Sequence, residues 1–104
     1  MRKTSLTITF RIRPDEVRLV ALGRAAWALR QLLNAGDKGC TPITHPGPRW
    51  SHYIWLLRGM GVLIETIHEP HAGPFPGTHA RYTLKSEVEI FSDTSRPDAE
   101  GIAA

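Results

Sequence analysis

The segment between Pro48 and Gly61 constrains the fold most, because both of its ends carry residues that bound helices. Proline suits the first position of a helix and glycine suits the position just after its end, so we expect a helix over residues 48–60. On a helical wheel the large apolar side chains gather on one side, which we expect to face the core. That side holds Trp50, Ile54, Leu57 and Gly61, flanked by Tyr53 and Met60.

The opposite side of this helix has a composition that a merely solvated surface seldom shows. It carries His52 and Trp55, edged by Ser51 and Arg58, with Arg49 on the other flank. A helix in the major groove presents its N-terminal residues to base edges, and arginine binds guanine in bidentate fashion. Serine and histidine can contact bases or phosphates, the helix N-terminus favours phosphate, and an indole suits a sugar or a thymine methyl. This side is therefore a candidate DNA-contacting surface.

Two other interpretations of these residues remain open at the level of sequence. Arg49 is compatible with a solvated position or with an ion pair to Glu65. Trp55 is compatible with packing under the loop around residues 68–77, or with a contact between two copies of the chain. The interpretations differ in the contacts that each side chain makes.

Residues 6–13 alternate between apolar and polar side chains, which predicts a half-buried strand. The unpaired edges of such a strand suit either pairing with a short strand at residues 87–91 or formation of a dimer. Further along, residues 62–69 and 79–85 are β-like and flank a loop rich in proline and glycine at 70–78. That pattern predicts a hairpin.

The helical part of the chain is expected to precede this hairpin. Residues 24–35 have the apolar spacing of an amphipathic helix, and residues 16–22 are compatible with one more helical turn before it. Residues 37–44 have room for one or two helical turns, with Thr41 as N-cap and Pro42 at the first helical position. The order is thus strand, helix, short helix, helix and hairpin.

Composition narrows the function only mildly. The chain has a net charge of +3, and residues 1–91 hold 12 basic and 7 acidic side chains. Such a charge permits a phosphate-binding surface without requiring one. No apolar run approaches the roughly 20 residues of a membrane span, and no secretory signal is evident. We therefore expect a cytoplasmic protein that does not enter a membrane.

No set of residues indicates catalysis. Cys40 is the single cysteine, which excludes an intrachain disulfide, and it is expected to be a half-buried structural residue. The sequence shows no glycine-rich phosphate loop, no paired carboxylates and no Ser/His/Asp set. We expect no enzymatic activity, no cofactor and no small-molecule substrate. His68, His71 and His79 match a zinc-ligating spacing only weakly, because they lie around a loop, so no metal site is expected.

The second strand of the hairpin supplies two further candidates for DNA contact. Arg81 shares one strand face with His79, Thr83 and Lys85. Arg81 and His79 are therefore expected to reach the DNA backbone or minor groove, and histidines facing phosphate would bind more tightly once protonated near about pH 6. The alternative is an ion pair between Arg81 and Glu65 on the partner strand.

A resemblance to the small winged helix domain proteins of alphaproteobacteria and their phages is carried by GRAAWALRQLLNAGDKGCTPITHPGPRWSHYIWLLRGMGVLIET followed by HEPHAGPFPGTHARYTL. More broadly, RWSHYIWLLRGMG is similar to the helix-turn-helix pattern Arg-x-Ser-x-x-Ile-x-x-Leu-Arg-x-x-Gly. The polar, core and turn positions of that pattern are Arg49, Ser51 and Arg58, then Ile54 and Leu57, then Gly61. The resemblance covers residues 23–85, so the strand at 6–13 lies outside it.

The resemblance implies an α+β winged helix-turn-helix fold, with three helices and a β-hairpin wing, here preceded by an extra strand. We expect one domain over residues 1–91, comprising the strand at 6–13, a helical core at 16–61 and a wing at 62–85. A mobile acidic tail is expected over residues 92–104.

The resemblance also implies double-stranded DNA as a partner, bound in a sequence-specific manner by a small transcriptional regulator or by an accessory factor of a phage or mobile element. The helix at 48–60 would enter the major groove, and the loop at 70–78 would touch the backbone or minor groove. The expected DNA-contacting residues are Arg49, Ser51, His52, Trp55, Arg58, His79 and Arg81. A homodimer is a further expectation. The alternative is a protein–protein interaction adaptor of the same fold, with an apolar contact patch formed by Trp55, Leu56 and Phe75.

Overall fold

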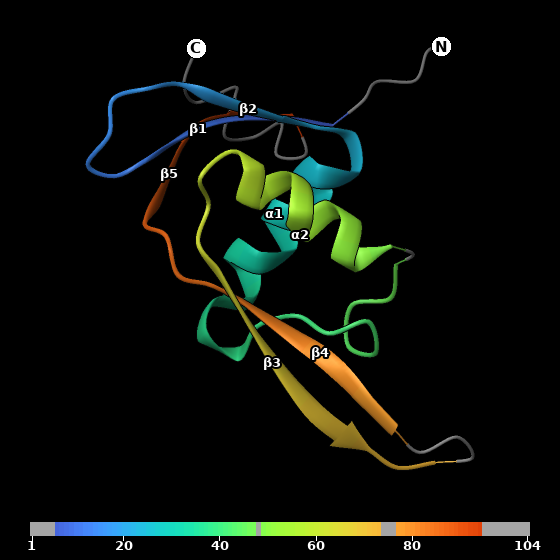
Figure 1. Cartoon of the computed structure of the whole chain (residues 1–104). Coiled ribbons are helices and arrows are strands. Elements are labelled where there is room, and N and C mark those ends of the chain that lie inside the picture. Colours follow the sequence, from blue (N-terminus) through green and yellow to red (C-terminus); the bar gives the residue numbers. More distant parts are fainter. Residues whose placement is uncertain (1–5, 48, 74–76, 95–104) are drawn as a thin grey trace, which may run out of the picture.

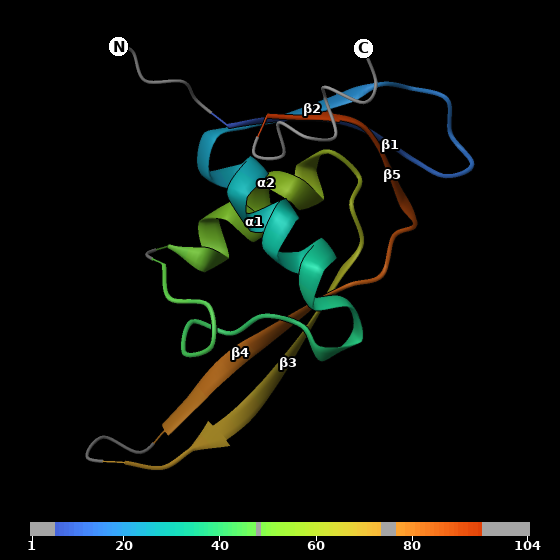
Figure 2. The same cartoon turned by 180° about the vertical axis from the view of Figure 1, so that it is seen from behind.

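The computed structural model describes residues 6–47, 49–73 and 77–94. Figure 1 shows three levels: a three-stranded sheet at one end, two helices in the middle, and a long hairpin that extends away from them. In Figure 1 α2 lies in front of α1, and in Figure 2, seen from behind, α1 lies in front. The elements are β1 (Thr7–Ile12), β2 (Leu19–Leu22), α1 (Gly23–Ala35), the 3₁₀ turn η1 (Gly36–Lys38), α2 (Trp50–Gly59), β3 (Ile64–His71), β4 (Gly77–Leu84) and β5 (Val88–Asp93).

The first sheet has the antiparallel order β2-β1-β5, so the predicted N-terminal strand is its central strand. Ile8 and Phe10 point inward and are fully buried against the helices. Of the two partners expected for this strand, the segment at 87–91 is confirmed, because β5 pairs with it. Dimerisation through β1 is wrong, since both of its edges are occupied within the chain.

The expectation of a helical turn at residues 16–22 is wrong, because β2 occupies the end of that segment. Within β2 Ala21 is fully buried, whereas its neighbours Val20 and Leu22 are 47% and 61% exposed. This alternation has the period of a strand rather than that of a helix. The chain then turns directly into α1 at Gly23, which has a φ of 59°.

The two long helices lie where the sequence predicts them, and they pack together under the sheet. The inward side of α1 carries small alanines as well as Leu29 and Leu32, which allows α2 to approach closely. The inward side of α2 agrees with the predicted apolar stripe, except that Gly61 is exposed. Its buried members are Trp50, Tyr53, Ile54 and Leu57.

The expected second helix is reduced to two separate turns, so the structure has two α-helices in its described part instead of three. The turn η1 ends at Gly39, and Cys40 then forms a two-way backbone bridge with Tyr82 of β4. This bridge requires an extended backbone and interrupts any helix. Thr41 does act as a cap, because its hydroxyl accepts the Thr44 N–H at 2.9 Å, and a single helical turn follows to His45.

The hairpin of β3 and β4, hereafter the wing, is longer than expected. Its strands pair from Ile64 opposite Leu84 to His71 opposite Gly77, so they include much of the segment expected as the loop 70–78. Phe75, proposed for an apolar patch, lies outside the described residues. At the other end, β5 continues through Asp93, which is buried and pairs with Arg30, so the first residues of the expected acidic tail belong to the sheet.

We predict opposite effects of two glycine substitutions on the free energy of unfolding. At Gly39 (φ 71°) a Cβ would lie 2.7 Å from Thr83 Oγ1 and from the Tyr82 carbonyl oxygen. Gly39→Ala should therefore lower this free energy by about 1–3 kcal/mol. A Cβ at Gly59 meets nothing within 4 Å, so Gly59→Ala in α2 should raise it by about 0.5–1 kcal/mol. Urea unfolding measures the free energy of unfolding of each variant. A value for Gly39→Ala equal to that of the unaltered chain would contradict the close packing at the backbone bridge between Cys40 and Tyr82.

Candidate nucleic-acid interface

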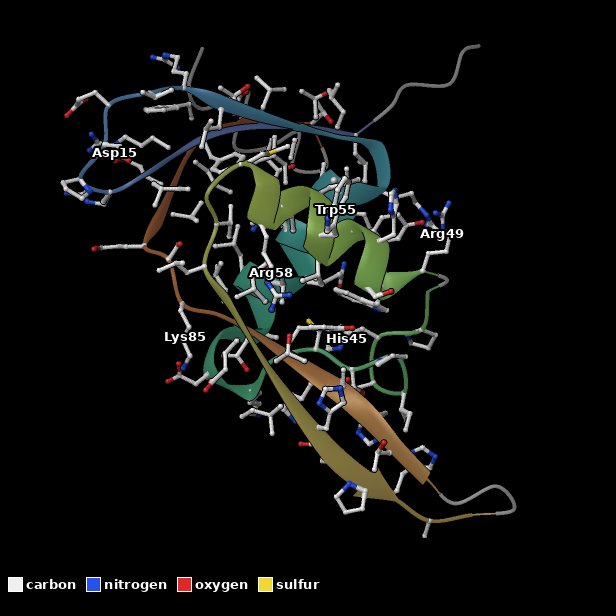
Figure 3. The ribbon with its side chains drawn as sticks, in the orientation of Figure 1. Asp15, His45, Arg49, Trp55, Arg58 and Lys85 are labelled. Atoms are coloured by element: carbon white, nitrogen blue, oxygen red, sulfur yellow. The ribbon has the colours of Figure 1, made fainter. Side chains whose placement is uncertain are left out.

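The outward side of α2 carries a continuous aromatic surface. Ser51 is exposed, His52 is half-buried, and the Trp55 side chain is 68% exposed. The His52 ring stacks on the Trp55 indole with their centroids 6.0 Å apart and their planes 17° apart. Figure 3 shows Trp55 on the open side of α2, away from the wing. Packing of Trp55 under the loop around residues 68–77 is therefore excluded for the described part of that loop.

Arg49 stands at the entrance to α2 in an unusual backbone conformation. It is the N-cap residue, with φ 64° and ψ 35°, and among the described residues no other non-glycine has a positive φ. Helix α2 thus begins two residues later than expected, at Trp50, and the Arg49 carbonyl accepts the N–H groups of His52 and Tyr53. A left-handed arginine is rarely adopted without a reason, and such residues are concentrated at functional sites.

The side chain of Arg49 is available for a ligand. It is exposed, and over residues 6–47, 49–73 and 77–94 its guanidinium makes no hydrogen bond and no ion pair. The alternative pairing with Glu65 is wrong, because Glu65 lies 3.5 Å from Lys85 instead. No acidic residue lies in the first turn of α2, so this helix end keeps its positive potential.

An aromatic cluster holds the start of α2 in place. Trp50 packs against Trp27 of α1 at 5.2 Å between centroids and donates its indole N–H to the His45 carbonyl at 2.7 Å. Gly47 lies so close to Trp27 that a Cβ there would be 2.8 Å from the ring, so the loop before α2 fits only without a side chain. These contacts fix where Arg49 leaves the surface.

Arg24 is a second basic residue on this cluster that the sequence analysis missed. Its guanidinium lies 5.4 Å from the Trp27 ring, in cation–π range. The available signal was its spacing, since residues three apart on a helix are neighbours. Arg24 and Arg49 therefore flank the Trp27–Trp50 pair from α1 and from the entrance to α2.

Arg58, expected to contact DNA, is exposed, but one of its nitrogens is engaged within the fold. Its Nη2 donates to the Ile64 carbonyl and to Thr66 Oγ1, both at 2.7 Å. Figure 3 shows it between α2 and β3. Arg58 therefore fixes the angle between α2 and the wing.

The basic residues expected on the wing are bound to a carboxylate of the wing itself. Arg81 donates from Nε to Glu69 Oε2 at 2.7 Å and from Nη2 to Glu69 Oε1 at 2.9 Å. Its third donor, Nη1, binds the Lys38 carbonyl at 2.7 Å. The alternative, an ion pair between Arg81 and a glutamate of the partner strand, is confirmed, but the glutamate is Glu69 instead of Glu65. Arg81 thus joins β4 to β3 and to the end of η1.

His79 completes this network and is only 14% exposed. Its Nε2 lies 3.0 Å from Glu69 Oε1, and its Nδ1 lies 2.9 Å from the Nδ1 of His71. Hydrogen bonds from Arg81 and then from His79 lower the pKa of Glu69 to about 2. The carboxylate therefore remains ionised at neutral pH, and neither Arg81 nor His79 offers an unpaired charge.

A cavity of about 420 Å³ separates the end of α1 from β4. Figure 3 shows His45 in this region, between α2 and the wing. The lining includes Lys38 beside the paired Arg81, so one basic side chain of this surface lies next to the wing. The walls of the cavity are formed by Asn34, Ala35, Lys38, Gly39, Thr44, His45 and Arg81.

Cys40 is fully buried rather than half-buried, and burial raises the pKa of its thiol to about 11. A thiol that stays protonated is a poor nucleophile. Among the described residues, no group of three or more His, Cys, Asp or Glu side chains is placed to hold a metal ion. No described helix has the length and hydropathy to cross a membrane.

Helix α2 with the wing directly after it is the arrangement of a winged helix domain, and a family model of that description matches residues 18–94. The chain belongs to the winged helix domain family. The match begins after β1, in agreement with the expectation that the N-terminal strand lies outside the common pattern. Comparisons with curated proteins and with solved structures gave no match.

Membership of the winged helix family suggests DNA binding in general, since domains of this kind are typically DNA-binding and not enzymes. In such domains the helix before the wing is typically the recognition helix, and α2 occupies that position in this chain. The more specific resemblance, to alphaproteobacterial and phage proteins, stays a prediction.

Proposed function

We propose that the protein binds double-stranded DNA in a sequence-specific, non-enzymatic manner, with α2 in the major groove. The observation that carries this proposal is the guanidinium of Arg49 at the start of α2, which has no partner among the described residues and lies beside Ser51, His52 and Trp55. An exposed arginine without an internal counter-ion gains most from a guanine edge or a phosphate. Its left-handed backbone is the local strain expected where position matters more than stability.

Each outward residue of α2 has a distinct role in this proposal. Arg49 reads guanine or binds the adjacent phosphate, and Ser51 binds a phosphate or base edge. The stack of His52 on Trp55 holds the indole in one orientation, suited to a sugar or a thymine methyl. Arg24 adds a backbone contact on the α1 side.

The wing has a supporting role in this proposal, which differs from the sequence-based expectation. His79 and Arg81 are engaged by Glu69 and the Lys38 carbonyl, so a DNA contact from either would require breaking these bonds. Arg58 is exposed, but its Nη2 is bound to β3. We assign to these three residues the task of fixing the wing relative to α2. Contacts of the wing with the DNA backbone would come from its other exposed residues.

The biological role that we propose is that of a small transcriptional regulator, or of an accessory factor of a phage or mobile element, acting on DNA in the cytoplasm. A rival role, the protein–protein adaptor, is favoured by one observation, the 68% exposure of Trp55. A large exposed aromatic residue is typical of protein interfaces as well. The DNA-binding role requires Arg49 to control affinity for a DNA duplex. The adaptor role requires Trp55 to control affinity for a protein partner, without a contribution from Arg49.

We further propose that two copies associate through β2. Within the described residues no strand pairs with its outer edge. The Gly23 N–H donates to the Leu6 carbonyl at 2.8 Å. In an antiparallel pair every second residue directs its N–H and C=O to the partner strand, so Ala21, two residues before Gly23, directs its own to β1. The N–H and C=O groups of Val20 and Leu22 therefore point outward. A second β2, antiparallel about a two-fold axis at Ala21, places Val20 opposite Leu22 of the second copy and covers both side chains.

Substitution of Arg49 tests the DNA proposal. On a duplex enriched from a random pool, Arg49→Ala should weaken binding by about 1–3 kcal/mol, which is about 5–150-fold. Arg13→Ala removes an exposed arginine in the turn after β1 and should leave affinity unchanged. Fluorescence anisotropy at several salt concentrations measures both. The DNA proposal fails if no duplex is enriched, or if Arg49→Ala binds the duplex as tightly as Arg13→Ala. In that case, loss of binding to a protein partner in Trp55→Ala would favour the adaptor role.

Substitution of Val20 tests the proposed dimer. Val20→Lys puts a charge on each side of the paired edge, so the mass measured by light scattering should fall from dimer to monomer. Val17→Lys changes a more exposed valine outside β2, 65% exposed against 47% for Val20, and should leave the dimer intact. A monomeric mass for the unaltered chain at high concentration, or an unchanged dimer of Val20→Lys, would contradict pairing through β2.

A further inference from the structure

Two histidines meet near the tip of the wing with their ring nitrogens facing each other. His71 and His79 lie on the same face of the hairpin, because His79 is opposite Glu69 and His71 is two residues further along β3. Their Nδ1 atoms are 2.9 Å apart and their ring centroids are 5.1 Å apart. Gly77, directly opposite His71, has no side chain to cover the ring.

The other nitrogen of His79 is bound in the manner typical of a metal-ligating histidine. Its Nε2 lies 3.0 Å from Glu69 Oε1, and Glu69 is itself held by two hydrogen bonds from Arg81. Because an ionised carboxylate only accepts hydrogen bonds, the Nε2 of His79 carries the proton. The Nδ1 of neutral His79 is then left with a lone pair. Ligating histidines commonly donate their second N–H to a carboxylate, which fixes the tautomer and the ring orientation.

We propose that His71 and His79 bind one divalent transition-metal ion through their Nδ1 atoms, at the tip of the wing. Glu69 and Arg81 act as positioning residues, since they hold the His79 ring without contacting the ion. Two nitrogens about 2.1 Å from one ion are about 3.0 Å apart in cis positions of a square-planar or octahedral site and about 3.4 Å apart in a tetrahedral one. At the observed separation of 2.9 Å the Nδ1–H of His71 donates to the Nδ1 of His79, so metal binding requires the His71 proton to move to its Nε2 and the two rings to tilt toward a common point.

The ligand set determines the class of ion. Imidazole nitrogens suit Zn²⁺, Ni²⁺ and Cu²⁺, whereas Ca²⁺ and Mg²⁺ prefer oxygen ligands. The described residues supply no third protein ligand, so water or an external donor completes the coordination. His68, although close in sequence, lies on the opposite face of β3 beside Ala80 and takes no part.

A metal ion here would change the charge of the wing. Glu69 neutralises Arg81, so the tip has no unpaired cation among its described residues. A bound ion adds positive charge and leaves coordination positions that can accept a phosphate oxygen of DNA. This consequence rests on the proposed DNA binding, whereas metal binding itself does not.

Titration of the tag-free protein with ZnCl₂ and NiCl₂, without DNA, tests the site. Calorimetry should show one saturable site per chain, lost in His71→Ala and in His79→Ala and retained in His68→Ala, the matched control on the same strand. Glu69→Gln should weaken the affinity by about 10–100-fold, because it removes the carboxylate behind His79. A saturable site unchanged in His79→Ala, or equally weakened in His68→Ala, would overturn the proposal.

A second measurement on the unaltered chain avoids any effect of the substitutions on folding. Long-range ¹H–¹⁵N spectra of the histidine rings should show zinc at Nδ1 of His71 and His79, with the His79 Nε2–H retained. Coordination through Nε2, small shifts spread over all histidines, or no response below millimolar zinc would contradict the site. Because no DNA is present, failure here leaves the DNA proposal standing, and failure of the Arg49 test leaves this one standing.

Discussion

The indole of Trp50 is the contact on which the candidate interface depends, because α1, the loop before α2 and the wing all meet it. Its ring lies 5.2 Å from Trp27 and 5.9 Å from Tyr82, and its N–H binds the His45 carbonyl. Only 3% of Trp50 remains exposed. Since successive helical residues are about 100° apart, fixing Trp50 inward turns the side with Ser51 and Trp55 outward. A buried aromatic contact thus determines which side chains a DNA groove would meet.

The distribution of carboxylates separates arginines that are paired within the chain from arginines that are not. One arginine of the sheet, one of α1 and one of the wing have a carboxylate partner: the pairs are Arg11–Glu89, Arg30–Asp93 and Arg81–Glu69. Among the described residues Arg24 and Arg58 have no carboxylate partner, but Arg24 lies over the Trp27 ring and Arg58 donates to β3. Arg49 has none among the described residues, although it sits at the positive end of α2. The guanidinium and the helix N-terminus together give this place a positive potential that favours a phosphate or a base edge with acceptor atoms, which is the electrostatic basis of the proposed function.

The sequence was sufficient to predict an element where a long periodic pattern of apolar residues corresponds to one buried face. Both helices, the N-terminal strand and the hairpin were predicted in this way, and the inward side of α2 agrees with its helical wheel. The sequence was insufficient where partners depend on register. A one-residue change in strand pairing would move Arg81 away from Glu69, and no local pattern fixes that register. Strand β2 is too short for its alternation to be distinguished from a helical turn, and the bridge from Cys40 to Tyr82 that removes the second helix joins residues 42 positions apart. The left-handed Arg49 has no signal in residue type.

The central claim is that the outward side of α2 meets DNA while Arg81 of the wing stays bound within the fold. The most direct test follows the backbone amides and the arginine side chains in ¹H–¹⁵N spectra as an enriched duplex is added. The account predicts the largest shifts at residues 49–55 and at the Arg49 Nε–H, with the Arg81 Nε–H unchanged because Glu69 still holds it. Shifts confined to β3 and β4 or to the three-stranded sheet, with α2 unaffected at saturation, would contradict it.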